Sequence, residues 1–157
     1  MSQSDAQPCG PVADAGYLLK EHTAMPDERN LKTLLQNMTP ELHEGVFVFC
    51  SLPEDKEIPA ALRPVHIFRE REGTAFIVRR EEAEAAGIPC QFASRLITLT
   101  VHSSLDAIGF LAAITGRLAE AGISVNAVSA FYHDHLFVPE HRASEALHLL
   151  QDMSRLA

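Results

Sequence analysis

The sequence has 157 residues, enough for one ordinary domain or for two very small units that share a core. Hydrophobic residues make up 46% and charged residues 22%, the balance of a globular protein with a real core. The net charge of −8 makes nucleic acid a poor partner, because phosphate repels an acidic chain. No apolar run approaches the roughly 18–20 residues of a spanning helix and no secretory signal opens the chain, so we expect a cytoplasmic protein with no membrane partner.

The three cysteines, Cys9, Cys50 and Cys90, are widely spaced and include no CxxC pair. An odd number at such spacing suggests neither a disulfide framework nor a zinc site. We therefore expect reduced thiols, with Cys50 and Cys90 as core residues. The sequence contains neither a GxGxxG motif nor a phosphate-binding loop, and we expect no cofactor.

The first half of the chain begins with a stretch unlike the rest. Residues 1–30 mix prolines and glycines with small polar residues and show no sustained period, which is typical of a flexible extension. The pattern then predicts a short helix at 31–39 and strands at 46–50, 65–69 and 74–78. A second helix at 80–86 and a short strand at 88–92 follow. A polar connection ending in Gly73 indicates a hairpin, and three prolines at 53, 59 and 64 leave room for at most one helical turn.

The second half has clearer patterns. The pattern predicts a strand at 96–102 and a helix at 106–121. Two strands at 123–130 and 135–138 and a last helix at 140–153 follow. Ser103 and Asp106 have the spacing of a capping box, and Gly122 is placed to end the first of these helices. The two halves have a similar order of strands and helices, which indicates a weak internal repeat. The expected architecture is an α+β fold, an antiparallel sheet with helices on one face.

Residues 105–126 contain Asp, two residues, Gly, and then an apolar helix that ends in Ala-x-x-Gly-Ile. This pattern resembles the signature of the ACT domain family. The stretches Leu-Thr-Val-His-Ser-Ser-Leu (99–105) and Tyr-His-Asp-His-Leu-Phe-Val-Pro (132–139) are similar to those of small stand-alone proteins with tandem ACT domains. The resemblance implies two ferredoxin-like βαββαβ units, a degenerate first unit at 31–93 and a second at 94–157.

The resemblance also implies a ligand site, because many ACT domains bind amino acids at the loop before the first helix, against the second strand of a neighbouring unit. Carried over to this chain, the candidate ligand-binding residues are Asp106, Ala107, Ile108, Gly109 and Asn126. A helix N-terminus with a glycine suits this role, since it lets a ligand approach and favours a carboxylate. The alternative is structural: Asp106 only caps the helix, and Gly109 only permits close packing. ACT sheets commonly pair side by side, which implies a homodimer.

The chain departs from the family pattern in two places. Too few residues follow the helix at 140–153 to form a last strand, so the second unit borrows one, with 46–50 as the candidate, or lacks it. The first unit has no full first helix, which argues against a standard ligand site there. Two such units are expected to interlock.

His133, Asp134 and His135 form the one cluster that suggests metal binding. In a strand the two histidines face the same side, and His102 ends a neighbouring predicted strand, so the three imidazoles are candidates for a pocket or a metal site. The alternative is a hairpin turn in which Asp134 bonds the backbone. A catalytic triad of Ser103 or Ser104, His102 and Asp106 is not expected, because neighbours along one strand end do not aim at one atom and no nucleophile elbow such as GxSxG is present.

The sequence as a whole favours a regulatory module that binds a small molecule, an amino acid, and has no catalytic activity. Two alternatives stay open. One is a protein–protein interaction module that keeps the fold without a ligand. The other is a small metal-dependent enzyme that uses His133, Asp134 and His135.

Overall fold

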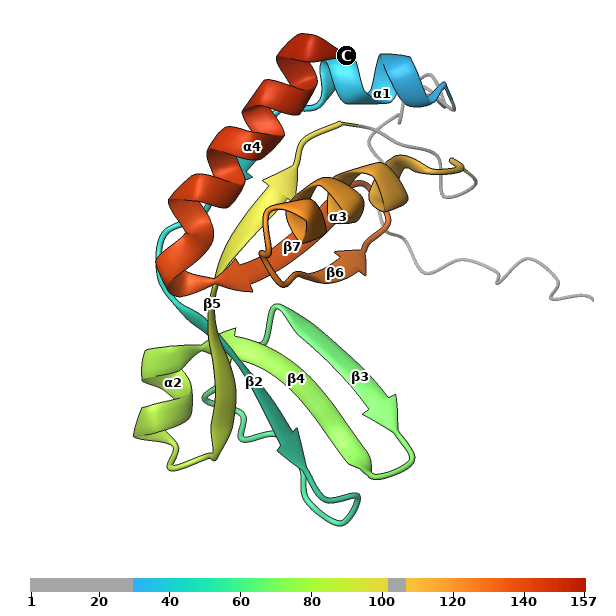
Figure 1. Ribbon diagram of the computed structural model, residues 1–157. Helices are drawn as coiled ribbons and strands as arrows, with labels where there is room; N and C mark the ends of the chain where they lie inside the picture. Colours follow the sequence, from blue (N-terminus) through green and yellow to red (C-terminus); the bar gives the residue numbers. More distant parts are fainter. Residues whose placement is uncertain (1–29, 102–106) are drawn as a thin grey trace, which may run out of the picture.

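The computed structural model of the protein describes residues 30–101 and 107–157 (Figure 1). The extension expected at 1–30 lies outside this range except for Asn30, as does the proposed capping box of Ser103 and Asp106. The described chain forms α1 (Leu31–Asn37), β1 (Pro40–Leu42), β2 (Phe47–Leu52), β3 (His66–Glu70), β4 (Gly73–Arg79), α2 (Arg80–Ala85), β5 (Cys90–Leu99), α3 (Phe110–Glu120), β6 (Asn126–Ser129), β7 (Asp134–Pro139), the 3₁₀ helix η1 (Glu140–Arg142) and α4 (Ala143–Leu156). None of the described helices is long and apolar enough to cross a bilayer.

One antiparallel sheet of seven strands runs through the whole described structure. Its order is β3-β4-β2-β5-β7-β6, and β1 pairs with β5 beside this path. The helices α2, α3 and α4 pack on one face of the sheet, α3 and α4 through one shared apolar cluster and α2 through another. The expected α+β architecture, with helices on one face of antiparallel strands, is confirmed.

Strand β5 belongs to both halves of the sheet. Its first part pairs with β2, its last part pairs with β7 and β1, and Ser94 lies opposite both Phe47 and Pro139. Two separate strands were expected here, at 88–92 and 96–102, and that expectation is wrong. A bulge joins them, with Phe92 at a φ of 55°, and an extra residue of this kind breaks the side-chain alternation by which a strand is recognised in a sequence.

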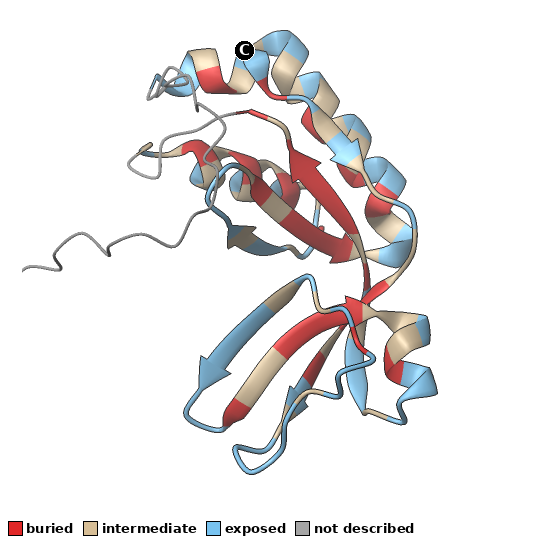
Figure 2. Ribbon diagram, turned by 180° about the vertical axis from the view of Figure 1, so that it is seen from behind, coloured by how far each residue is buried: buried red, intermediate tan, exposed pale blue. Residues whose placement is uncertain are grey.

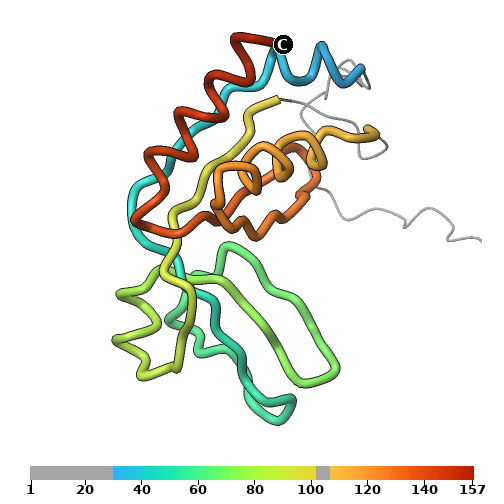
Figure 3. The backbone as a smooth tube through the Cα atoms, viewed as in Figure 1, coloured from blue at the N-terminus to red at the C-terminus, as the bar shows by residue number. Residues whose placement is uncertain are grey.

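The second unit consists of the last part of β5, α3, β6, β7 and α4, in the expected order. The position of its missing last strand, on the free side of β5, is taken by β1, where Leu42 lies opposite Ile97 and Pro40 opposite Leu99. The candidate at 46–50 was wrong, because that segment forms β2 and pairs with the first part of β5. Figure 3 shows how the chain from α1 to β1 runs alongside α4.

The core of the second unit is formed by residues from both ends of the described chain. Leu34 and Met38 of the α1 region are buried together with side chains of β5, α3, β7 and α4. Asn30 caps α1 by accepting a hydrogen bond from Thr33 N at 3.2 Å. The predicted helix at 140–153 begins with the 3₁₀ turn η1 and extends to Leu156.

The first unit consists of β2, β3, β4, α2 and the first part of β5. Between β2 and β3 the described chain has no helix, as the prolines predicted. The hairpin of β3 and β4 is confirmed, and Glu70 lies opposite Gly73 at its turn. Gly73 has a φ of 143°, and a Cβ atom there would lie 2.1 Å from the carbonyl oxygen of Leu52, so only glycine fits.

The helix-free face of the sheet carries an aromatic cluster that joins the two units. Phe137 of β7 makes edge-to-face contacts with Phe47 and Phe49 of β2, with ring centroids 6.0 and 5.5 Å apart. Ile77 and Leu96 complete the buried part of this cluster. Figure 2 shows the buried strand centres and the exposed β3 edge.

Candidate functional site

The loop before α3 holds most of the ligand residues implied by the family resemblance. Asp106 lies outside the described residues, as does His102. Ala107 is half-buried and Ile108 is 87% exposed. Helix α3 begins at Phe110 rather than at residue 106, because Gly109 takes a left-handed backbone with a φ of 87° and acts as the N-cap.

The N-terminus of α3 is suited to hold an anion. The first hydrogen bond of the helix runs from Ala113 N to the carbonyl oxygen of Gly109, at 2.9 Å. The amide groups of residues 110–112 therefore have no acceptor within the helix. A Cβ atom added to Gly109 would meet, among described atoms, Leu31 Cδ2 at 3.7 Å, an ordinary contact. The turn thus leaves room for a small group beside these amides.

Asn126, the fifth implied ligand residue, lies far along the chain from this turn, at the start of the edge strand β6. It is exposed and faces β3 and β4 of the first unit across a groove of about 430 Å³. The residues that line the groove on the other side include Phe49, His66, Phe68 and Glu70. Asn126 is thus placed at the junction of the two units, whereas residues 107–109 are absent from the lining of this groove.

The three-residue cluster His133, Asp134 and His135 is split by the strand. Asp134 is buried and accepts a hydrogen bond from Ser129 Oγ at 2.6 Å, while His135 lies on the opposite face of β7. His135 Nδ1 lies 3.0 Å from Thr98 Oγ1, and His43 Nε2 lies 2.7 Å from the same hydroxyl. Within residues 30–101 and 107–157, no three His, Cys, Asp or Glu side chains are arranged to hold a metal ion.

Burial lowers the pKa of His135, and the nearby imidazoles of His133 and His43 lower it further, against a smaller opposite effect of Asp134. His135 is therefore favoured as a neutral imidazole in the folded protein. The sequence analysis did not identify His43 as a neighbour of this strand. His43 follows the strand β1, which pairs with residues 97–99 but has only three residues. So short a strand leaves no periodic pattern in the sequence by which its neighbours could be predicted.

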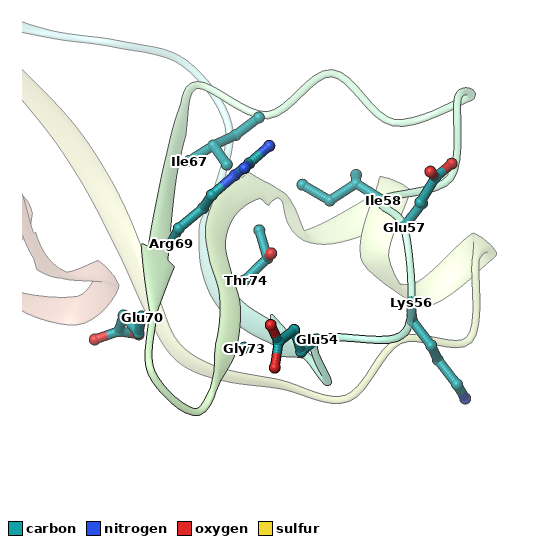
Figure 4. A pocket seen from close by; sticks show the side chains of 9 residues that line it. All are labelled: Glu54, Lys56, Glu57, Ile58, Ile67, Arg69, Glu70, Gly73 and Thr74. Atoms are coloured by element: carbon teal, nitrogen blue, oxygen red, sulfur yellow. The ribbon is translucent and has the colours of Figure 1, made fainter.

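A second hollow, of about 600 Å³, lies on the helix side of the β3–β4 hairpin (Figure 4). It occupies the region where the first unit has a loop in place of its first helix. Figure 4 shows Arg69 extending toward Ile58, and Glu54 pointing toward Thr74, while Lys56 points away. Acidic and basic groups are mixed here and the hollow is wide open, so it selects no ligand class.

The ACT domain family matches the chain twice, over residues 26–95 and 91–152. A Vibrio cholerae protein of unknown function, described as a possible transport protein, is 41% identical to this chain; the match covers 79% of this chain and 95% of that one, with a TM-score of 0.71. No curated protein matches the chain.

Two further solved structures share the fold at lower identity. A protein from Agrobacterium tumefaciens is 18% identical, and the match covers 74% of this chain and 89% of that chain, with a TM-score of 0.65. The ligand-free regulatory subunit of aspartate kinase from Thermus thermophilus is 13% identical, with 74% and 98% covered and a TM-score of 0.55.

The chain belongs to the ACT domain family, whose members are regulatory modules that generally bind small ligands. More particularly, it is a tandem ACT protein in which the two domains share strand β5 and in which β1 takes the place of a last strand in the second domain.

Proposed function

We propose that this tandem ACT protein is a regulatory module that binds an amino acid and has no catalytic activity of its own. The observation that carries the proposal is the left-handed Gly109 turn at the N-terminus of α3. The amides of residues 110–112 supply donors for a carboxylate, and the positive end of the helix dipole adds to their attraction. The absence of a side chain at Gly109 lets the ligand reach these amides.

The second half of the proposed site is Asn126. In the family the loop of one unit meets the second strand of a neighbouring unit, and here Gly109 and Asn126 belong to the same unit. We therefore place the ligand between two copies of the chain, with Gly109 of one copy facing Asn126 of the other. ACT sheets commonly pair side by side, so the protein is expected to be a cytoplasmic homodimer.

A ligand-free interaction module is the second candidate function. It is favoured by three exposed apolar side chains, Ile108 at 87%, Phe131 at 73% and Tyr132 at 47% exposure. Contiguous exposed apolar groups often mark protein interfaces, and the rings of Phe131 and Tyr132 are in edge-to-face contact with centroids 4.9 Å apart. The two candidates differ in whether a small molecule stabilises the chain.

A thermal-shift panel of the twenty amino acids separates them. A ligand at about 100 times its Kd adds about 2.7 kcal/mol, which corresponds to about 5–10 °C for a chain of this size. Gly109→Asn is expected to abolish the shift, because asparagine tolerates a left-handed backbone but fills the space. Asn126→Ala is expected to weaken the shift and the dimer together, as measured by light scattering.

Gly87→Asn is the matched control. Gly87 also has a positive φ, of 64°, and follows α2 with nothing within 4 Å of an added Cβ atom. This variant should keep the full shift. A panel without any shift at millimolar concentrations would contradict the ligand-binding proposal and favour the interaction module.

A further inference from the structure

Cys50 and Cys90 lie directly opposite each other on the antiparallel strands β2 and β5. Directly opposed residues share a face of the sheet, with Cβ atoms about 4.5–5.5 Å apart. A disulfide bond requires Cβ atoms about 3.5–4.5 Å apart and Cα atoms about 4.4–6.8 Å apart. The two thiols can therefore be joined by a small movement of the strands.

The two cysteines differ in their surroundings. Cys50 is 5% exposed and belongs to the apolar cluster beneath α2, together with Val48 and Phe76. Cys90 is exposed at the first residue of β5, so the expectation of a core residue is confirmed for Cys50 and wrong for Cys90. Because Cys90 is exposed and Cys50 is buried, a small reagent from solvent reaches Cys90 first, and Cys50 lies next to it across the strand pair.

The sulfur atoms also interact electrostatically. Burial raises the pKa of Cys50, and the neighbouring charge of Cys90 raises it further. Cys50 is thus held as a thiol near neutral pH, and Cys90 is the residue with the better access for a first reaction.

We propose that Cys50 and Cys90 are a reversible thiol–disulfide pair that responds to peroxide. The thiolate of Cys90 attacks hydrogen peroxide, which forms an S–O bond, breaks the O–O bond and releases hydroxide. Cys50 then loses its proton and attacks the sulfur of the Cys90 sulfenic acid, which forms the S–S bond, breaks the S–O bond and releases a second hydroxide. The protons of the two thiols convert both hydroxides to water, and the two thiols together supply the two electrons that reduce one peroxide.

The bond would act on the strand that the two domains share. Residues 51–89, which include β3, β4 and α2, lie between the two cysteines and would be enclosed in one covalent loop. Closing a loop of this length restricts the unfolded chain and stabilises the first domain, which should raise Tm by roughly 5–15 °C.

The test is made on the full chain carrying Cys9→Ser, because Cys9 lies outside the described residues and offers a third thiol. After treatment with hydrogen peroxide we expect the loss of both remaining thiols and of two hydrogen atoms by intact mass. Peptide mapping without reductant should link Cys50 to Cys90, at a rate independent of protein concentration. Dithiothreitol should restore both thiols and the original Tm.

Two further variants separate this outcome from others. In Cys9→Ser with Cys50→Ser, dimedone should trap a sulfenic acid on Cys90. In Cys9→Ser with Cys90→Ser, Cys50 should stay reduced; because Cys90 is exposed, this variant is expected to fold even where the Cys50 variant does not. Conversion of Cys90 to sulfinic acid while Cys50 keeps its thiol would overturn the proposal, and so would a disulfide between two chains in the Cys9→Ser protein.

Discussion

Thr98 Oγ1 lies 3.0 Å from His135 Nδ1, across the adjacent strands β5 and β7. The same hydroxyl lies 2.7 Å from His43 Nε2, in the loop that follows β1. A hydroxyl carries one proton, so Thr98 donates to one imidazole and accepts from the other. This buried side chain therefore ties the borrowed β1 segment to the centre of the second domain.

Thr98→Val removes the hydroxyl at nearly constant shape, and we expect a loss of about 1–3 kcal/mol in the free energy of unfolding, since two imidazole nitrogens lose their partner. Thr100→Val is the matched control, because Thr100 donates to the carbonyl oxygen of Thr39 at an exposed position and its loss should cost less. Urea denaturation measures both. Equal losses for the two variants would contradict a special role for Thr98.

The stability of the protein should depend on the protonation of His135. Its pKa in the folded state lies below the ordinary value of 6.5, chiefly because of burial. A lowered folded pKa means that the unfolded chain binds the proton more readily, so the contribution of His135 is fully present above pH 6.5 and is lost as the pH falls through the folded pKa.

His135→Gln should flatten the decrease in unfolding free energy below pH 6.5, measured by urea denaturation at a series of pH values. His148→Gln serves as the control, since His148 is exposed on α4. The unfolding free energy of this control variant should depend on pH as it does in the parent chain. The same slope in all three proteins would assign the acid sensitivity to other groups.

Substitution of glycine by alanine should have opposite effects on stability at Gly73 and Gly116. Gly73→Ala should destabilise the protein by more than about 2 kcal/mol, because the methyl group would meet the carbonyl of Leu52 and the backbone is strained at this φ. Gly116→Ala, within α3 and with nothing within 4 Å, should stabilise it by about 0.5–1 kcal/mol. Thermal unfolding of both variants checks the pair, and a stable Gly73→Ala protein would contradict the hairpin geometry.

The contact between the two domains depends on Phe137. Phe137→Ala should cost about 3–5 kcal/mol, because this ring packs on both Phe47 and Phe49 at the junction. Phe131→Ala removes the same group from a position 73% exposed and should change the stability by less than about 0.5 kcal/mol. Chemical denaturation should show the difference directly; a small effect at Phe137 would mean that the domains are held together elsewhere.

The local elements of this protein were largely predictable because their signals lie within a few residues of one another. The apolar stripe of α3, the glycine that follows it, and the polar turn of the β3–β4 hairpin each identified an element. The resemblance over residues 96–139 identified the family in the same way. The ligand residues at 107–109 and Asn126 could be named from this pattern, and their role stays a prediction.

Pairings between distant segments were decided only by the tertiary structure. A strand of three residues, β1, is too short to show a period, and its place beside β5 follows from backbone hydrogen bonding and from the burial of Leu34 and Met38. The bulge at Phe92 shifts the alternation on which strand prediction depends. The pairing of Cys50 with Cys90 and the contact of His43 with Thr98 could not be predicted from the sequence. Both depend on strand register, which is fixed by contacts between segments that are far apart in the sequence.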